Sequence, residues 1–325
     1  MKKLATILTI LLCLLLLLNA FWAKKKSFPS EPITIICPWS PGGGTDRTAR
    51  YIAELLSKEL GQPVNVVNKI GGDGAIGHSF GANAKPDGYT ICNVTFELGS
   101  LKYLGYSDIS PSSFIPVVQY NDNAASVIVK ADSPYNTVKE LLDDIKAKPV
   151  GTFSFSGASL GSVWDLARIG LLNKYGIDPN KVKYIPTKGA APAIIELLGG
   201  HVDVITCSYP EAAPQIEGGQ LKVLGLMAEK RNPDFDQVPT LKEQGIDWTY
   251  TTWRGFAVPL KTPKAVVNKL IDAFNKVFET QDFKDFMKKN GFGIKIRNGK
   301  DFGDFMDSQH QGLKEIFEIS GYGKK

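Results

Sequence analysis

The chain has 325 residues, with 38 basic and 33 acidic side chains and a net charge of +5 at pH 7. This near balance, with no basic cluster other than Lys24–Lys26, argues against nucleic acid as a partner. The length exceeds what one hydrophobic core usually holds, and 43% apolar residues are enough to fill two, so we expect two domains.

The N-terminus predicts export from the cytoplasm. Two lysines precede an uncharged apolar run from Leu4 to Ala23, the pattern of a signal peptide, which we assign to residues 1–23. Ala20 and Ala23 offer cleavage sites. The run is also close to the about 20 residues that a membrane-spanning helix needs, so an uncleaved anchor is the alternative.

After the signal, short apolar strands alternate with helices, as in a parallel α/β sheet. The first third predicts strands over 33–37, 64–68 and 89–94, a helix over 46–60 and a short helix ending at residue 85. The middle repeats this order and predicts a second sheet, with strands over 126–130, 152–155, 182–186, 202–206 and 221–228 and helices over 137–146, 163–169, 190–198 and 211–217. The last quarter predicts an extended segment over 253–258, helices over 263–280, 283–289 and 302–319, and a short strand within 291–296.

Three cysteines remain after the signal, Cys37, Cys92 and Cys207, each within a strand-like apolar run. Their odd number and the lack of metal-ligand spacing favour buried thiols over a disulfide or a metal site. We expect neither a metal nor a cofactor.

The segment Pro38–Asp46 joins the first strand to the first helix and carries three successive glycines, at 42–44. Glycines let the backbone approach a ligand closely, and a helix N-terminus presents unpaired N–H groups with a partial positive charge. The segment therefore predicts an anion site. Thr45 or Asp46 is expected to be the N-cap of the helix, and for Asp46 capping is favoured over ligand contact. No lysine follows the glycines, so this is not a nucleotide P-loop.

A second glycine-rich turn, Gly71–Gly77, matches the dinucleotide fingerprint at Gly72, Gly74 and Gly77. That fingerprint belongs to the first strand–helix unit of a nucleotide-binding half, whereas here it follows the second strand. We favour a tight turn, or a second anion-facing turn at the same edge of the sheet.

The predicted second sheet has comparable turns. Ser156, Ser159 and Ser162 lie where a strand gives way to a helix, and hydroxyls there either bind carboxylate oxygens or cap the helix. We assign Ser156 and Ser159 to binding and Ser162 to capping. Lys188 and the segment Ser208–Glu211 mark two more candidate turns, although Lys188 is equally explained as a solvated side chain.

The chain resembles the receptors of tripartite tricarboxylate transporters, also called the TctC or Bug family. The resemblance covers nearly the whole chain after the signal, and its ordered motifs are specific as a set: Pro38–Asp46, Leu60–Val64, Asn68–Gly77, Pro86–Thr90, Ser156–Ser162, Lys188–Ala193, Leu198–Asp203, Val238–Leu241, Gly255–Pro259 and Thr262–Pro263.

This resemblance implies an α/β, periplasmic-binding-protein-like Venus flytrap, with lobe 1 formed by residues 27–120 plus 251–325 and lobe 2 by 121–250. It implies a periplasmic, monomeric receptor, not an enzyme, that passes a small carboxylate to the permease subunits of a membrane transporter. The ligand would lie between two walls. By position, one wall comprises Ser40, Gly42, Gly43, Thr45, Asp46, Gly72, Gly74 and Thr95, and the other comprises Ser156, Ser159, Lys188 and Ser208.

Several residues depart from the family pattern. Trp164 and Asp165 stand where histidine is common, and Thr187 stands where tyrosine is frequent. Trp39 is an aromatic beside the anion site and Arg254 a candidate bidentate partner for a carboxylate, so both join the predicted site. For Trp39 and Trp253 we favour core packing over ligand contact. The ligand stays open among tricarboxylates, dicarboxylates, amino acids and aromatic acids.

Two other functions are compatible with the sequence. A ligand-loaded sensory partner of a membrane kinase would use the same cleft. A hydrolase or isomerase using Ser156 is disfavoured, because no G-x-S-x-G motif surrounds the serines and nothing places His78, His201 or His310 beside them.

Overall fold

The computed structural model describes residues 27–322. The predicted signal at 1–23 lies outside these residues. Within them we find no helix that is both long and apolar enough to cross a bilayer.

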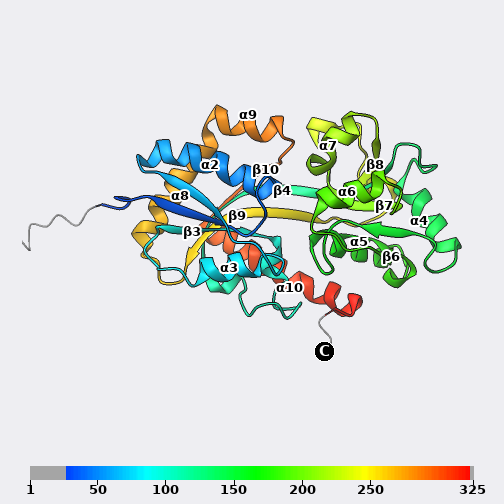
Figure 1. Ribbon diagram of the computed structural model, residues 1–325, viewed down its shortest axis with the longest axis horizontal. Coiled ribbons are helices and arrows are strands. Elements are labelled where there is room, and N and C mark those ends of the chain that lie inside the picture. The colour runs from blue at the N-terminus through cyan, green and yellow to red at the C-terminus, as the bar shows by residue number, and fades with distance from the viewer. Residues whose placement is uncertain (1–26, 323–325) are drawn as a thin grey trace, which may run out of the picture.

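Two α/β lobes are joined by two strands that run from one lobe into the other, β4 (Phe114–Lys130) and β9 (Thr251–Pro259) (Figure 1). In the first lobe the sheet has the order β2-β1-β3-β9-β4, and β10 pairs with the other edge of β4. The bounds are β1 Ile33–Cys37, β2 Val64–Asn68, β3 Thr90–Thr95 and β10 Ile294–Asn298. β1, β2 and β3 are parallel, whereas β9, β4 and β10 are antiparallel to their neighbours.

The second lobe is built on the C-terminal part of β4. Its other strands are β5 Ser154–Ser156, β6 Lys183–Tyr184, β7 Val204–Ser208 and β8 Leu221–Leu226. β4 pairs with β9 up to Ala124 and with β7 from Ala125 onward. The expectation of two separate parallel sheets was therefore wrong: the strands form one mixed sheet of ten that is continuous through β4.

The sequence analysis missed the first twelve residues of β4. These residues include Pro116 and the polar stretch Gln119–Asn123, so they lack the apolar pattern of a strand. Two of the polar side chains bond within the crossing itself: Asn121 Nδ2 donates to Asn123 Oδ1 and to the carbonyl of Gly293. The lobe boundaries stay a prediction; 120/121 lies inside β4, whereas 250/251 lies where a loop ends and β9 begins.

The helices lie close to the predicted ranges. Their bounds are α2 Gly44–Leu60, α3 Ala75–Ala82, α4 Val138–Ala147, α5 Val163–Lys174, α6 Ala190–Leu198, α7 Tyr209–Glu217, α8 Lys264–Glu279, α9 Gln281–Lys289 and α10 Gly299–Ser320, and a short 3-10 turn, η1, spans Phe96–Gly99. α10 runs from the first lobe toward the second (Figure 1), and Tyr322, just after it, donates a hydrogen bond to Asp165 of α5.

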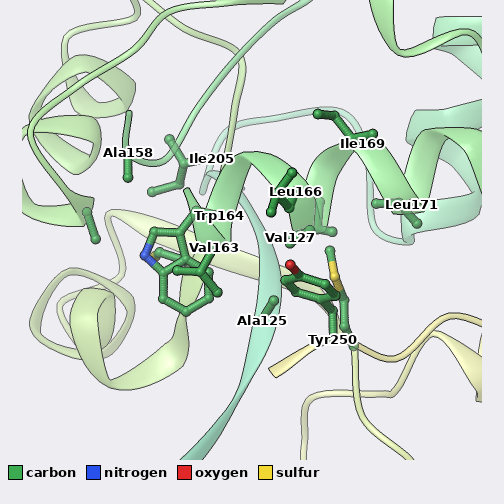
Figure 2. Close-up of a cluster of buried hydrophobic side chains, with 14 of the residues drawn as sticks. Ala125, Val127, Ala158, Val163, Trp164, Leu166, Ile169, Leu171, Ile205 and Tyr250 are labelled. Carbon is green, nitrogen blue, oxygen red and sulfur yellow. The ribbon is translucent and has the colours of Figure 1, made fainter. Parts of the chain in front are cut away.

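The core of the second lobe forms where α5 packs on β4 (Figure 2). Trp164 is 4% exposed, and Leu166 and Val127 are fully buried in the same cluster. Burial of side chains of this size contributes about 1.5–3 kcal/mol each. Trp164 is thus a core residue.

Two sequence predictions about burial are confirmed. Trp253 is fully buried and makes edge-to-face contacts with Phe302 and Phe305, so it packs in the core. Cys37, Cys92 and Cys207 are buried free thiols.

Candidate ligand-binding site

The predicted binding turns lie at two strand ends that face each other. β4 runs from the first lobe into the second. β9 is antiparallel to β4 and β3 to β9, so β3 and its parallel neighbours β1 and β2 run toward the second lobe. β7 is antiparallel to β4, so β7 and its parallel partners β5 and β6 run back toward the first lobe. The turns also touch, because Ser159 Oγ donates to Asp73 Oδ1 across the lobes at 2.5 Å. Gly161 lies so close to Leu104 of the first lobe that an added Cβ would be 2.4 Å from Leu104 Cδ2.

The first turn is held by Asp46. Its Oδ2 accepts from the N–H of Gly42 at 2.8 Å, its Oδ1 accepts from Asn68 Nδ2 at 2.8 Å, and Arg50 forms an ion pair with it. Burial raises the pKa of Asp46, but the hydrogen bonds from Arg50, Gly42 and Asn68 outweigh this and hold the pKa below its usual value. The Asp46 carboxylate therefore stabilises the turn through hydrogen bonds within the protein.

The N-cap prediction for this helix was wrong. Gly43 is the N-cap and makes no side-chain capping bond, while Thr45 and Asp46 lie inside the first helical turn. The physical reason is Gly42, whose φ of 83° lets the chain fold back so that Asp46 reaches the N–H of residue 42 instead of a helical N–H. The N–H groups at the start of α2 have no intrahelical acceptor and stay available to an anion. Ser40 is exposed at the start of the turn.

Arg254 lies behind the first turn with only neutral partners. It faces Thr95 across the β3–β9 pair and is 6% exposed. Nε donates to Thr45 Oγ1 at 2.9 Å and Nη1 to Asn121 Oδ1 at 2.5 Å. Among residues 27–322, Arg50, Arg168 and Arg231 pair with acids, whereas Arg254 has no carboxylate within 4.0 Å. A buried guanidinium without a counter-ion is costly, so an anion in the cleft would stabilise it.

The free end of that guanidinium lies against Gly44. A Cβ added to Gly44 would be 3.2 Å from Arg254 Nη2 and 3.2 Å from the ring of Phe292. No described residue accepts a hydrogen bond from Nη2. Gly44 therefore leaves room for Nη2, the nitrogen of Arg254 for which the described residues offer no acceptor.

The second turn is a tight turn, as favoured from the sequence. Gly71, Gly72, Asp73 and Gly74 all have positive φ, at 130°, 55°, 48° and 87°, a conformation that favours glycine. Gly77 is required by packing, since an added Cβ would be 2.6 Å from Pro38 Cα. The glycine spacing that imitates the dinucleotide fingerprint thus follows from backbone conformation and close packing.

A buried polar network links the two turns. His78 Nδ1 bonds the carbonyl of Gly74 at 2.9 Å and Nε2 accepts the N–H of Thr95 at 3.3 Å. Burial lowers the pKa of His78 to about 4, so the ring is neutral and its Nδ1 carries the hydrogen. Trp39, half-buried, donates Nε1–H to Thr95 Oγ1 at 3.2 Å, and that hydroxyl donates to Glu97 Oε2 at 2.7 Å. Thr95 and Trp39 therefore orient each other, and the Thr95 hydrogen is already bonded.

Glu97 is a site residue that the sequence analysis missed. It is 5% exposed in η1, directly after β3, and burial raises the pKa of its carboxyl to about 7. The available signal was one acid within the apolar run Thr95–Leu98 at the end of a binding-edge strand.

The second lobe repeats the first turn. Gly161 has a φ of 74° and donates its N–H to Asp165 Oδ2 at 3.0 Å, as Gly42 does to Asp46. Ser162 donates its N–H to the carbonyl of Ser159 at 3.2 Å, as Gly43 does to Ser40 at 3.4 Å. Both turns share the pattern Ser-x-Gly-x-x-x-Asp, which the sequence analysis did not find.

Two serines of the predicted wall, Ser156 and Ser208, and the predicted cap Ser162 have other partners. Ser156 is fully buried and donates to the carbonyl of Ile185 at 2.7 Å. Ser208 forms a capping box with Glu211 at the start of α7, donating to its Oε2 at 2.8 Å. Ser162 is at the N-cap position of α5, as predicted, but its hydroxyl donates to the carbonyl of Ser159 instead of capping. The hydroxyls of Ser156 and Ser208, which the sequence assigned to a ligand, are thus bonded within the protein, Ser156 to a distant segment and Ser208 to its own helix start.

Lys188 is exposed and forms no hydrogen bond with the described residues, just before Gly189 at the start of α6. Of the predicted second wall, Ser159 is thus the side chain that reaches the opposite lobe.

A groove of about 520 Å³ lies between the lobes; none of the predicted site residues lines it, but Phe292, which lies beside Gly44, does. Tyr209, Phe235, Lys284, Lys288 and Phe292 line it. Among residues 27–322, no group of three His, Cys, Asp or Glu side chains is placed to hold a metal.

The two lobes meet through glycine-rich turns, and a buried arginine without a counter-ion lies behind one of these turns. These features define a solute-binding protein of the periplasmic type. Residues 48–321 match the model of the tripartite tricarboxylate transporter family receptor, TctC. The chain belongs to this family.

Individual relatives agree with this assignment. A TctC solute-binding protein from Polaromonas is 38% identical, with a TM-score of 0.75 over 90% of this chain and 99% of that one. The UPF0065 protein in the gbd 5' region of Cupriavidus necator is 31% identical over 93% of this chain and 91% of its own. MatC from Rhodopseudomonas palustris, solved with bound malate, is 24% identical with a TM-score of 0.79 over 89% and 100% of the two chains, which supports the fold.

Proposed function

We propose that this protein is a periplasmic receptor that captures a small carboxylate between its lobes and delivers it to the permease subunits of a tripartite tricarboxylate-type transporter. The observation that carries the proposal is Arg254, a buried cation with neutral partners, beside the free N–H groups at the start of α2. Family membership and the malate bound to MatC support the ligand class.

In the proposed mechanism the ligand selects the closed form. A carboxylate on Arg254 and on the first turn would also meet Ser159 or the start of α6 only when the lobes are together. Contacts that exist in one state alone shift the equilibrium toward that state. The Ser159–Asp73 hydrogen bond joins the two lobes, which supports a contact of this kind in the closed form.

The sequence pattern of the N-terminus supports the periplasmic location. The apolar run at 4–23 follows two lysines, as in a signal peptide. Delivery to a permease rests on the family, and a sensory partner would use the same closed surface. Co-purification from membranes with a permease subunit or with a kinase separates the two roles.

No observation favours the hydrolase alternative. The histidine ring nitrogens contact Gly74 and Thr95 (His78), Glu196 (His201) and Gly99 (His310). Ser156 and Ser159 donate to a carbonyl and to Asp73, so neither is bonded to a histidine base.

A panel of small carboxylates tests the proposal by thermal shift and by calorimetry. At least one should raise the melting temperature, and Arg254→Gln should weaken its binding by about 2–5 kcal/mol, the usual effect of removing one partner of a buried charge pair. Arg231→Gln is the matched control, because Arg231 is exposed and pairs with Glu243. If no carboxylate stabilises the protein, or if both variants bind alike, the assignment of the ligand class and of Arg254 fails.

A further inference from the structure

The groove between the lobes has aromatic walls and lies beside β4, the strand that crosses from one lobe to the other. Its volume is about 520 Å³, and β4 contributes residues 122–124 to its lining. Tyr209 and Phe235 line it from the second lobe, with their rings stacked at 4.0 Å between centroids and each side chain 7% exposed. Phe292 lines it from the first lobe. Because both lobes contribute, the shape of the groove depends on how the lobes are placed.

Three lysines at the groove have no acidic partner among the described residues. Lys284 and Lys288 are four residues apart on α9, so they lie on one face of that helix, and Lys230 follows β8 in the second lobe. All three are exposed, and none has a carboxylate oxygen within 4.0 Å in residues 27–322. Two acids, Asp122 and Asp234, also line the groove, and burial raises the pKa of Asp122. The groove therefore carries an excess of positive charge that comes from both lobes.

Exposed lysines around aromatic rings suit a protein segment better than a small anion. Arg254 is 6% exposed, and a buried cation of this kind can hold a single carboxylate strongly. An exposed lysine gains little from one ion pair, whereas several together speed association and fix the register of a charged partner. Aromatic pockets surrounded by charged side chains are typical of protein–protein interfaces. The groove thus fits an acidic segment that also carries an apolar anchor.

Phe292 connects the groove to the candidate ligand site. Its ring lies beside Gly44 at the start of α2, and the guanidinium carbon of Arg254 is 5.9 Å from the ring centroid. The preceding residue, Gly291, meets the second lobe, since a Cβ added there would be 3.2 Å from Cγ of Pro210, which lines the groove. A segment in the groove would therefore contact residues at which the lobes meet, next to Arg254.

We infer that this groove is the docking site for an acidic segment of the permease, which places an apolar side chain against the aromatic rings and carboxylates against Lys230, Lys284 and Lys288. The inference rests on the proposed function and adds to it the surface through which the receptor meets its membrane partner. Two copies of this chain meeting through the groove would bring like charges together, which disfavours a second copy. A segment that spans both lobes favours the arrangement in which the lobes meet.

Docking to the tripartite tricarboxylate-type permease subunits of the same organism, reconstituted in nanodiscs, tests the inference, and calorimetry of carboxylate binding is the second measurement. Lys284→Glu/Lys288→Glu should weaken docking at least about tenfold and reduce its salt dependence, while carboxylate affinity stays unchanged. Lys289→Glu is the matched control. Lys289 is the next residue on α9, is exposed and does not line the groove, so its variant should change docking by less than about threefold.

A variant without a change of charge tests the shape of the groove. Ala228 lines it, and Ala228→Trp should fill it and weaken docking at least about tenfold without altering carboxylate affinity. The lysine variants change exposed side chains, so they remain a test even if Ala228→Trp does not fold.

The outcomes separate this inference from the proposed function. If the groove variants dock like the wild type, or if empty nanodiscs bind the protein equally well, the docking site is wrong while the carboxylate receptor stands. Self-association that Lys284→Glu/Lys288→Glu abolishes would give the groove to a second copy and also overturn the inference. If the wild-type protein binds a carboxylate but no permease subunit, the docking site and the delivery step both fail and capture stands. Failure of every carboxylate to bind overturns the ligand class by calorimetry alone, and the docking measurement still decides the groove.

Discussion

The turn after β1 and the turn after β5 have the same internal hydrogen bonds in different surroundings. In each, an aspartate four residues after a left-handed glycine accepts that glycine's N–H, at 2.8 Å for Asp46 and 3.0 Å for Asp165. Asp46 pairs with Arg50, whose side chain is 49% exposed, whereas Asp165 pairs with Arg168, which is 4% exposed. The same hydrogen-bond pattern thus occurs with a half-exposed arginine at the first turn and with a buried arginine at the second.

The strand ends next to these turns show a similar contrast. Ser208, at the end of β7, donates to Glu211, which caps α7. Thr95, at the end of β3, donates to Glu97, but only the short turn η1 follows. The acid of the second lobe caps a helix, whereas the acid of the first lobe accepts the Thr95 hydroxyl and so belongs to the network that orients Trp39.

Replacing each of the two aspartates should give the largest difference in stability between the two turns. Asp165→Ala should destabilise the protein by about 3–5 kcal/mol, because it leaves Arg168 buried without a partner. Asp46→Ala should cost about 1–2 kcal/mol, since Arg50 can turn into solvent and the turn loses hydrogen bonds. Urea unfolding measures both.

The control for this pair is Asp143→Ala, an acid on α4 that is 53% exposed and pairs with Lys139. Its effect should stay within about 0.5 kcal/mol. Equal losses for Asp46→Ala and Asp165→Ala would mean that the burial of the arginine does not distinguish the two turns.

The dependence of stability on pH tests the buried network of the first lobe. The pKa of Glu97 is raised from 4.5 to about 7, so the folded state keeps its proton while the unfolded state loses it, and stability falls as pH rises over this window. The pKa of His78 is lowered from 6.5 to about 4, so stability falls as pH drops from 6.5 to 4. Between pH 4.5 and 6.5 the two effects oppose each other.

Glu97→Gln removes one of the two opposing effects. We compare how the free energy of unfolding changes from pH 5 to pH 6.5. This change should be about 2 kcal/mol more favourable in Glu97→Gln than in the wild-type protein. Urea unfolding at the two pH values measures this difference, and Glu54→Gln, which changes an exposed acid paired with Lys58, should follow the wild type. Identical pH profiles for Glu97→Gln and the wild type would show that Glu97 is not held protonated by burial.

Most of the fold was predictable from the sequence because its elements are short, periodic and separated by glycine or proline. α6 was predicted with its observed bounds, Ala190–Leu198. The first part of β4 was not predictable in this way, since its polar residues Gln119–Asn123 are satisfied only by contacts at the crossing between the lobes.

The candidate site was predicted in part. The glycine turns and Arg254 carry their signal locally, through backbone conformation or charge. Ser156 misled the prediction because its acceptor is the carbonyl of Ile185, 29 residues further along the chain. Glu97 was missed although its signal is local, a single acid directly after the third strand of the binding edge, because the burial that raises its pKa is a property of the folded lobe.

The two left-handed glycines give the smallest expected effect and the sharpest test of closure. Alanine at Gly42 or Gly161 should cost about 1–2 kcal/mol of stability, because both have positive φ. Gly42 has open space around the new Cβ, whereas at Gly161 the Cβ would lie 2.4 Å from Leu104 Cδ2 on the opposite lobe. Gly161→Ala should therefore also hinder closure and weaken carboxylate binding, while Gly42→Ala should not act through closure. Gly105→Ala is the control, with φ at 69° and no neighbour within 4 Å. Equal ligand affinity in Gly161→Ala and Gly105→Ala would show that the contact with Leu104 is not part of the ligand-bound state.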